Sequence, residues 1–314
     1  MPLIAAGSVA LAAAGDRLVA EPPAELHPVA WLGRALGPLD RPWHRPRLAG
    51  VATALLVPLL AAGVVAGVVA LGGGIHPILG AGVAGLACFV TTSRRMLLDE
   101  ARAVVAASET DLPTARARLR ALAGRDATAL SAGEVRSAAV ESAAENLSDG
   151  LVAPLAGFAL LAPVSLPAAA GAAAWIKAVN TLDSTFGYRS VPMGWAPARL
   201  DDIVMWVPAR ASAILLAIAG GQPGAVRRAR SLARRPASPN AGWPMATIAV
   251  LLGVRLSKPG AYDLTANRRS ADGRTASNEG SDDLPTQANA ERGVAVVSRA
   301  GWLAFGLAGV IALC

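Results

Sequence analysis

The feature that most restricts the fold of this chain is an uncharged apolar run from residue 49 to residue 71, AGVATALLVPLLAAGVVAGVVAL. A helix rises about 1.5 Å per residue, so a run of this length crosses the roughly 30 Å hydrocarbon core of a bilayer. It is the strongest candidate span in the sequence. We therefore predict a membrane-spanning helix at this position.

The composition agrees with a membrane protein. Of the 314 residues, 54% are hydrophobic and only 16% are charged, whereas an average soluble domain has about 25% charged residues. The 32 glycines and 22 prolines fit membrane helices, in which neighbouring segments satisfy the backbone groups that these residues leave free. A soluble, alanine-rich protein is the alternative that this composition leaves open.

Further apolar segments predict an all-α fold, a polytopic helical protein of the cell membrane that forms one embedded domain over residues 1–314. These segments are residues 3–20, 78–98, 203–221 and 294–314. The loop before the strongest span is rich in arginine, and the turn GGGIHP after it has none. The positive-inside rule therefore predicts that the N-terminus is outside and that residues 94–150 are cytoplasmic.

The segments between the spans differ in character. Residues 99–150 mix charged residues with Ala and Leu, and we expect a cytoplasmic helical hairpin with its turn at Gly124. Residues 151–176 are divided by prolines into halves too short to span singly, so we expect a Pro-broken hairpin that folds back. Residues 265–290 are polar, without aromatic residues or an apolar period, and are expected to be a disordered insertion.

The charge favours an anionic partner or an anionic membrane surface. The net charge is +7 and the sequence pI is about 10.6. The arginines cluster beside apolar segments, at residues 41–47, 94–95 and 227–235, as topology signals do. The lipid bilayer is therefore the expected partner, and nucleic acid is not.

Cysteine and histidine give no metal or disulfide pattern. Cys88 and Cys314 have no CxxC neighbour, which excludes a zinc site or a disulfide framework of the usual spacing. His27, His44 and His76 are scattered, and two of them precede proline, which is typical of turn residues rather than metal ligands.

Polar residues concentrate in the central region, first in ESAAENLSDG at residues 141–150. In a helix Glu141, Glu145 and Asp149 recur at intervals of four and share one face. Three like charges repel, a bound cation would relieve that cost, and oxygen ligands alone suit magnesium better than zinc or copper. The alternative is a solvated helix face on which Arg136 offsets part of the charge.

The second cluster is KAVNTLDSTFGYRS. Lys177 and Asn180 share one helical face with Asp183 close by, and Tyr188-Arg189 follow the expected helix end. Basic residues beside carboxylates suit the binding of phosphate groups with a bridging metal, while surface ion pairs at a helix end are the alternative. The sequence has no GxxxxGK[ST] motif, so a Walker-type ATPase is not supported.

The third cluster enters an apolar segment. Asp202, Trp206 and Arg210 recur at intervals of four, and such a stripe supports either a substrate cavity or a structural ion pair. In the later stretch SPNAGWP, Asn240 and Trp243 either cap a site or end a helix.

On these segments the sequence resembles the adenosylcobinamide-phosphate synthase family of cobalamin biosynthesis. The matching segments, in the family's order, are HPVAWLGR, LAGRD, ESAAENLSDGLVAPL, KAVNTLDSTFGYRS, GWAPARLDDIVMWVPAR and SPNAGWPMA. They run through most of residues 10–262, and the ordered set is far more specific than any one motif.

The resemblance implies an integral membrane enzyme that joins aminopropanol, or its O-phosphate, to a propionate carboxylate of adenosylcobyric acid. ATP and Mg²⁺ are the implied co-reactants. The short link after Tyr188-Arg189 and the polar stretch 265–290 depart from the family pattern and leave open whether the amine is free or phosphorylated. Association with other corrinoid enzymes is left open too.

The implied reaction gives each polar cluster a role. The expected magnesium ligands are Glu145, Asp149, Asp201 and Asp202. The expected catalytic residues are Lys177, which neutralises phosphate charge, and Glu141 or Asp183, which takes the proton of the amine. The expected substrate-binding or phosphate-binding residues are Asn146, Asn180, Tyr188, Arg189, Arg199, Arg210 and Asn240. Because ATP is cytosolic, we expect this site on the cytoplasmic side.

Two other classes compete with the ligase. A membrane transporter for a corrinoid or another anionic molecule would use Arg210 and the Pro-broken segments as a substrate path. A non-catalytic membrane scaffold would use its cytoplasmic hairpin to dock soluble partners. Turnover of ATP by the purified protein would distinguish the enzyme from both.

Overall fold

The computed structural model describes residues 2–124, 126–187, 191–265 and 284–314, and most of these residues are helical. The all-α fold of a membrane protein is confirmed. Residue contacts divide the chain into two compact units. Unit 1 comprises Met1–Arg95, Asp149–Pro208 and Ala304–Cys314, and unit 2 comprises Met96–Ser148 and Ala209–Leu303.

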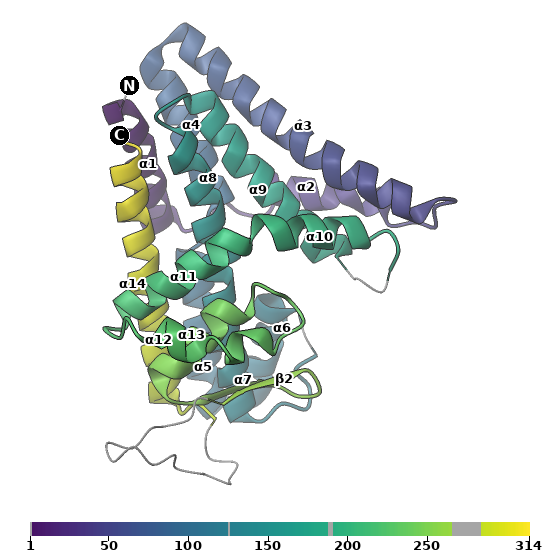
Figure 1. Cartoon of the computed structure of the whole chain (residues 1–314), viewed down its shortest axis with the longest axis vertical. Helices are drawn as coiled ribbons and strands as arrows, with labels where there is room; N and C mark the ends of the chain where they lie inside the picture. Colours follow the sequence, from purple (N-terminus) through teal and green to yellow (C-terminus); the bar gives the residue numbers. More distant parts are fainter. Residues whose placement is uncertain (1, 125, 188–190, 266–283) are drawn as a thin grey trace. The chain divides into compact units, whose positions relative to one another are not determined.

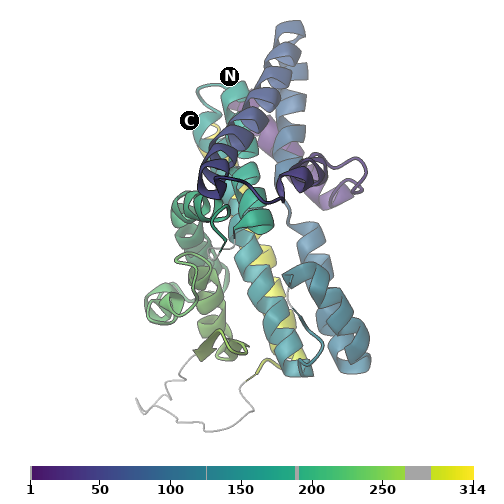
Figure 2. The same ribbon diagram turned by 90° about the vertical axis from the view of Figure 1, so that its right-hand side faces the viewer.

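Unit 1 is built around long apolar helices. Its elements are α1 (Pro2–Val19), α2 (Pro28–Leu36), η1 (Gly37–Leu39), α3 (Pro46–Ile75), α4 (Pro77–Thr91), the part of η2 (Leu147–Val152) from Asp149, α8 (Ala153–Leu161), α9 (Leu166–Phe186), α10 (Trp195–Val204) and the end of α14 (Gln287–Ile311) from Ala304. Helix α3 packs against α4 and α9, and α1 packs against α4. Figures 1 and 2 both show α3 and α4 as neighbours, which meet at His76.

Proline sets many of the helix starts in unit 1. Helices α2, α3, α4, α8 and α9 each have Pro within their first two positions. The first N–H groups of a helix have no intrahelical partner, so proline costs nothing there, and its fixed φ suits the helix. His27 and His76 act as N-caps of α2 and α4, in agreement with the prediction that they are turn residues.

Four helices are long and apolar enough to cross a membrane in the described part of the chain. They are Pro2–Val19, Pro46–Ile75, Pro77–Thr110, which counts α4 together with the helix that follows it, and Gln287–Ile311. The bent pair Trp195–Val204 and Trp206–Ala219 makes a fifth if it counts as one span. They match the apolar segments predicted from the sequence. Leu55, Leu59 and Leu60 of α3 project outward, as expected of a lipid-facing helix.

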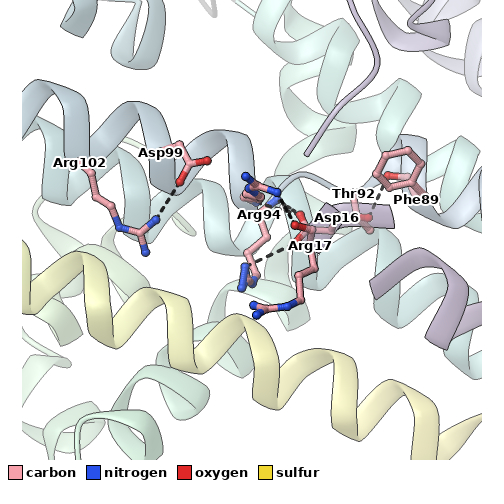
Figure 3. Close-up of polar contacts among 8 residues, drawn as sticks. Asp16, Arg17, Phe89, Thr92, Arg94, Asp99 and Arg102 are labelled. Carbon is pink, nitrogen blue, oxygen red and sulfur yellow. Dashed lines mark hydrogen bonds and ion pairs between the residues drawn. The ribbon is translucent and has the colours of Figure 1, made fainter. Parts of the chain in front are cut away.

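The helix at residues 78–98 ends earlier than expected, at Thr91, and α5 (Arg95–Thr110) starts after a short break. At this break the Asp16 carboxylate accepts hydrogen bonds from the backbone N–H groups of Arg94, at 3.0 Å, and Arg95, at 2.8 Å (Figure 3). It also forms a buried ion pair with the Arg94 guanidinium at 3.4 Å. A carboxylate at a helix start satisfies orphan donors, so Asp16 fixes the end of α1 to this junction.

The Pro-broken segment folds back as predicted. Helices α8 and α9 pack against each other, and residues 162–165 form the turn between them. Pro154 and Pro167 lie in the first turns of the two helices, whereas Pro163 lies in the connection. The side of the membrane on which this hairpin lies stays a prediction.

Unit 2 combines short helices with a small β-hairpin. Its elements are α5, α6 (Leu112–Ala123), α7 (Ala132–Asn146), the part of α11 (Trp206–Ala219) from Ala209, α12 (Ala225–Ala229), η3 (Leu232–Arg234), α13 (Gly242–Leu252), β1 (Arg255–Lys258), β2 (Tyr262–Thr265) and α14 (Gln287–Ile311) up to Leu303. Residues 99–150 contain three helices instead of the two expected. The extra break arises because Asp111 caps α6 and Pro113 starts it.

The β-hairpin was not predicted, because strands of four residues are too short for a clear period. Its strands are antiparallel, with Arg255 opposite Thr265 and Lys258 opposite Tyr262. Gly260, which follows a proline in the turn, has a φ of +74°, a value that glycine adopts without strain. Of the expected insertion at 265–290, residues 266–283 lie outside the described residues, and residues 287–290 are the start of α14.

Candidate functional site

Four aspartates gather in unit 1 and are named here the aspartate cluster: Asp149, Asp183, Asp201 and Asp202. Asp201 has the other three as its charged neighbours. Asp149 lies in the π-helical turn η2 (Leu147–Val152), Asp183 lies near the end of α9, and the other two lie on α10, which packs against α9. The structure therefore brings together four predicted site residues from three separate segments.

Asp201 is the member of the cluster with an unsatisfied atom. Its Oδ1 is buried and has no hydrogen-bond partner among the described residues, although the side chain of Asn180 does hydrogen-bond to this aspartate. Leaving a charged acceptor buried and unsatisfied is costly, and three like charges nearby add to the cost. This arrangement is one that a cation, or a proton donor on a ligand, would relieve.

Lys177 provides positive charge beside the cluster. It lies in the polar second half of α9, outside the candidate spans, and its charged neighbours are Glu21 and Asp149. Burial lowers the pKa of Lys177, while the charges of these two acids act in the opposite direction. The ammonium group therefore lies between the aspartate cluster and an acid from the link between α1 and α2.

Glu21 is held in a defined position by residues from two other segments. His27 places Nε2 at 3.5 Å from the Glu21 carboxylate, and its Nδ1 accepts a hydrogen bond from the Val29 N–H. Because Nδ1 is an acceptor, a neutral His27 carries its proton on Nε2, facing Glu21. Burial raises the pKa of Glu21, but hydrogen bonds from His27 and Ser93, with the charges of His27 and Lys177, outweigh burial and lower it.

Two further features shape the cluster. Arg199 lies 3.8 Å from Asp202, but its guanidinium is largely exposed, so this contact is a weak ion pair that a phosphate could replace. At the end of α9, a Cβ on Gly187 would collide with the side chain and backbone of Asp183. Glycine at this position therefore permits the observed orientation of the Asp183 carboxylate.

The donor set of the cluster fits Mg²⁺ in type, because all its ligands are oxygens. Among the residues that the structure describes, however, no three His, Cys, Asp or Glu side chains are arranged as a ready-made metal site. Mg²⁺ usually keeps several waters and binds through one or two carboxylates together with substrate phosphates. The cluster therefore fits a metal that binds with its phosphate ligand, with Asp201 as the first candidate.

The predicted stripe of Glu141, Glu145 and Asp149 is not carried by one unbroken α-helix. Helix α7 ends at Asn146, and the wider turns of η2 change the register before Asp149 is reached. The two glutamates belong to unit 2, whereas Asp149 belongs to unit 1. The interval of four assumed an unbroken α-helix, which the sequence pattern alone could not test.

Glu141 lies fully buried in unit 2. It accepts hydrogen bonds from the Ser137 hydroxyl at 2.6 Å and the Tyr262 hydroxyl at 2.7 Å, and Ser137 accepts one from the Ser257 N–H. These bonds join α7 to the β-hairpin. Glu141 is thus engaged on both carboxylate oxygens, which favours a structural role over that of a proton acceptor.

Arg210 and Asn240 do meet, within unit 2. The Arg210 guanidinium donates a hydrogen bond to Asn240 Oδ1 at 3.0 Å and lies over the ring of Trp243 at 4.9 Å. The predicted stripe from Asp202 through Trp206 to Arg210 is wrong, because the helix is bent by 47° at Met205. A guanidinium oriented by an amide and an indole is suited to an anionic or planar ligand.

The remaining predicted site residues are less informative. Asn146 is the last residue of α7 and donates a hydrogen bond to the Ser142 carbonyl at 3.0 Å, and Glu145 is half-buried in the same helix. Tyr188 and Arg189 lie outside the described residues. The expected roles of Asn146, Tyr188 and Arg189 in binding substrate or phosphate stay predictions. The expected role of Glu145 as a magnesium ligand stays a prediction too.

Glu21 and Ser93 were not anticipated as site residues. Both lie in short links between helices, and only the packing of unit 1 brings them near Lys177. One sequence signal pointed to this region, because the family segment HPVAWLGR begins at His27, whose ring faces Glu21.

The fold and this polar site define an all-α membrane protein with a half-buried charged cluster in one of its units. The model of the family described as CobD/Cbib protein matches residues 9–289, and the chain belongs to this family. No solved structure matches the chain.

Curated relatives agree with the family assignment. The chain is 38% identical over 264 residues to the cobalamin biosynthesis protein CobD of Klebsiella pneumoniae subsp. pneumoniae, a match that covers 79% of this chain and 80% of the relative. It is 36% identical over 294 residues to CobD of Rhodobacter capsulatus, covering 87% and 85%. A probable CobD of Methanothrix thermoacetophila is 34% identical over 279 residues, covering 83% and 87%. Together these matches assign the protein a role in cobalamin biosynthesis.

Proposed function

We propose that this protein is an ATP-dependent amide ligase that joins aminopropanol, or its O-phosphate, to the propionate carboxylate of adenosylcobyric acid. The products are adenosylcobinamide, or its phosphate, ADP and inorganic phosphate. The observation that carries the proposal is the aspartate cluster beside Lys177, with the buried, unpartnered Oδ1 of Asp201.

The chemistry explains why such a cluster is needed. A carboxylate does not condense with an amine in water, because its oxygen is a poor leaving group. Transfer of the γ-phosphoryl group from ATP to the carboxylate oxygen forms an acyl phosphate, and the amine then displaces phosphate from the carbonyl carbon. Both steps require groups that hold negatively charged phosphate oxygens in place.

The residues of unit 1 divide this work. Asp201, with Asp149 or Asp202, would hold Mg²⁺, which neutralises phosphate charge when it is bound. We assign the binding of phosphate oxygens to Lys177, a charged neighbour of Asp149, and to the exposed Arg199, which can exchange its weak contact with Asp202 for a phosphate. Asn180 fixes the orientation of Asp201 through its hydrogen bond.

The proton of the attacking amine needs an acceptor. Asp183 belongs to the aspartate cluster, whereas both carboxylate oxygens of Glu141 accept hydrogen bonds within unit 2. We therefore assign the proton transfer to Asp183. The cytoplasmic location of the site and the roles of Arg210 and Asn240 in binding substrate are part of the same proposal.

A product assay tests the proposal. Purified protein in detergent is incubated with adenosylcobyric acid, Mg²⁺, ATP and either amine, and the products are identified by mass spectrometry. The ligase forms an amide product only when ATP is present, and the reactive amine is identified by the mass. Absence of any amide product from a folded preparation that binds the corrinoid would contradict the proposal.

A further inference from the structure

Five exposed arginines lie close together in unit 2 and are named here the arginine surface: Arg227, Arg228, Arg230, Arg234 and Arg235. They occupy α12, η3 and the residues that follow each, in the segment between α11 and α13 (Figure 1). Ala225, Ala229, Leu232 and Ala233, which alternate with them, are buried, and α12 and η3 both pack against α13. The packing of these small apolar residues directs the arginines outward.

The side chains of the arginine surface have few polar partners in the part of the chain that the structure describes. Within the described residues, none of its five members forms an ion pair with a carboxylate. Arg228 donates a hydrogen bond to the neutral Gln222 at 2.7 Å, and Arg235 donates one to the backbone carbonyl of Asp263 at 2.6 Å. Like charges this close repel one another, so the surface is suited to an anionic partner.

Arginines elsewhere in unit 2 behave differently. Arg102 pairs with Asp99 at 2.9 Å, Arg118 with Glu100 at 3.3 Å, and Arg120 with Asp126 at 3.6 Å. These three side chains are about half exposed, as an ordinary solvated helix surface requires. Exposed arginines of unit 2 can therefore find carboxylate partners, which the five members of the arginine surface lack among the described residues.

Apolar surface adjoins the arginine surface along the chain. The unit 2 part of α11 exposes Ile214 and Ile218, each by about half, and α11 belongs to the bent pair that counts as a candidate span. An exposed apolar helix followed directly by a dense basic segment is the pattern of a protein surface at the headgroup layer of an anionic membrane.

From this arrangement we propose that the arginine surface binds the phosphate headgroups of anionic phospholipids. The charges are spread over two short helical turns instead of converging on one point, which suits several headgroups in a layer better than a single nucleotide. The inference does not depend on the ligase reaction.

The test compares two triple variants with equal loss of charge. In Arg227→Gln/Arg228→Gln/Arg230→Gln the arginine surface loses three charges, and in Arg102→Gln/Arg118→Gln/Arg120→Gln the paired arginines lose three. Native mass spectrometry of the full-length protein in detergent measures binding of phosphatidylglycerol and of zwitterionic phosphatidylcholine. Since each basic residue near an anionic surface contributes roughly fivefold in affinity, we expect the first variant, which loses three, to bind phosphatidylglycerol roughly 100-fold more weakly. The second variant should bind it as the wild type does.

Three results would overturn the proposal. The first is that the first variant binds phosphatidylglycerol as tightly as the wild type does. The second is that the wild type binds the two lipids equally. The third is that the first variant loses ATP binding while its lipid binding stays intact. The single variants Arg227→Gln and Arg230→Gln, each with a partial loss expected, carry the test if the triple variant does not fold. Arg227→Lys/Arg228→Lys/Arg230→Lys should retain most of the binding, because attraction to a headgroup layer depends mainly on charge.

Discussion

Asp201 keeps a buried carboxylate oxygen without a partner in an environment of three other aspartates. A residue that contributed only to stability would not be placed in this way, because both burial and repulsion oppose its charge. Positions that break a local rule of stability are commonly functional ones. A substitution that removes the charge of Asp201 should therefore raise the stability of the protein and lower its activity.

Asp201→Asn keeps the shape of the side chain and removes its charge. We expect the protein without metal to become more stable by about 1 kcal/mol, which raises its melting temperature by about 2–4 °C. Ligase turnover should fall by about 100-fold, because a group that positions charge in the reaction is lost. Thermal unfolding in detergent and the product assay measure the two effects.

The exposed Asp126, which lies outside the aspartate cluster, provides a matched control. Asp126→Asn should change neither turnover nor the response to Mg²⁺. A variant Asp201→Asn with full turnover and an unchanged requirement for Mg²⁺ would show that the metal assignment is wrong.

Glu21 gives a pH-dependent effect whose sign follows from its lowered pKa. The ordinary value is 4.5, so the charged form contributes stability above that pH, and the contribution is lost as pH falls through the lower pKa of the folded state. Glu21→Gln should therefore cost about 1 kcal/mol at pH 7, and the difference from wild type should shrink below about pH 4.5. Melting temperatures measured from pH 3.5 to pH 7 test this, with Glu25→Gln, at an exposed position nearby, as the control.

At the residue level, sequence reasoning selected the residues that the structure brings together in unit 1, but not how they are arranged. Asp149, Lys177, Asn180, Asp183, Asp201 and Asp202 were all selected because charged and amide groups are rare in this apolar chain. Glu21 was not selected, because its closeness to Lys177 depends on how distant segments pack.

At the level of elements, the assumption of regular helices was the main source of error. The π-helical turn η2 and the 47° bend at Met205 each interrupt a spacing of four on which a predicted stripe depended. Both irregularities lie next to aspartates of the cluster. π-helical turns often occur at functional sites, and η2 contains Asp149.

The position of α10 depends on a close approach between α3 and the link before it. A Cβ added at Gly50 of α3 would overlap the backbone carbonyl of Met193, which precedes α10. Gly50→Ala should therefore destabilise the protein by about 1–3 kcal/mol and reduce turnover, because α10 carries Asp201 and Asp202. Thermal unfolding and the product assay give the two readouts.

Gly67, on the same helix, has open space where its Cβ would lie. Gly67→Ala should be neutral or stabilising by up to about 1 kcal/mol, because alanine favours the helix. Equal destabilisation by the two substitutions would contradict the role given to the contact at Gly50.

At the level of the whole molecule, the positions of the long apolar helices were predictable, because hydrophobic length is a local property of the sequence. The fold-back of α8 on α9 was predictable for a similar reason, since prolines divide the segment. The division of the chain into two units, each assembled from distant segments, was not anticipated, because no local pattern encodes it.

The sidedness of the molecule gives a prediction that labelling can test. Ser184 is an exposed residue of α9, and Cys88 is buried, so only Cys314 needs replacement by serine in the background. We expect Ser184→Cys to react with a membrane-impermeant maleimide only from the cytoplasmic side. Gly74→Cys, in the exposed last turn of α3, should react from outside. Labelling of Ser184→Cys from outside intact cells would contradict the cytoplasmic site.

The central claim is that ATP activates the substrate carboxylate before the amine attacks it, and an isotope experiment tests it most directly. The corrinoid substrate is labelled with ¹⁸O in its reactive carboxylate and turned over with ATP, Mg²⁺ and the amine. The acyl-phosphate route transfers one labelled oxygen to inorganic phosphate for every amide formed, and mass spectrometry detects that mass shift. Amide formation with unlabelled phosphate would contradict this route, and the absence of both amide and labelled phosphate would contradict the ligase assignment itself.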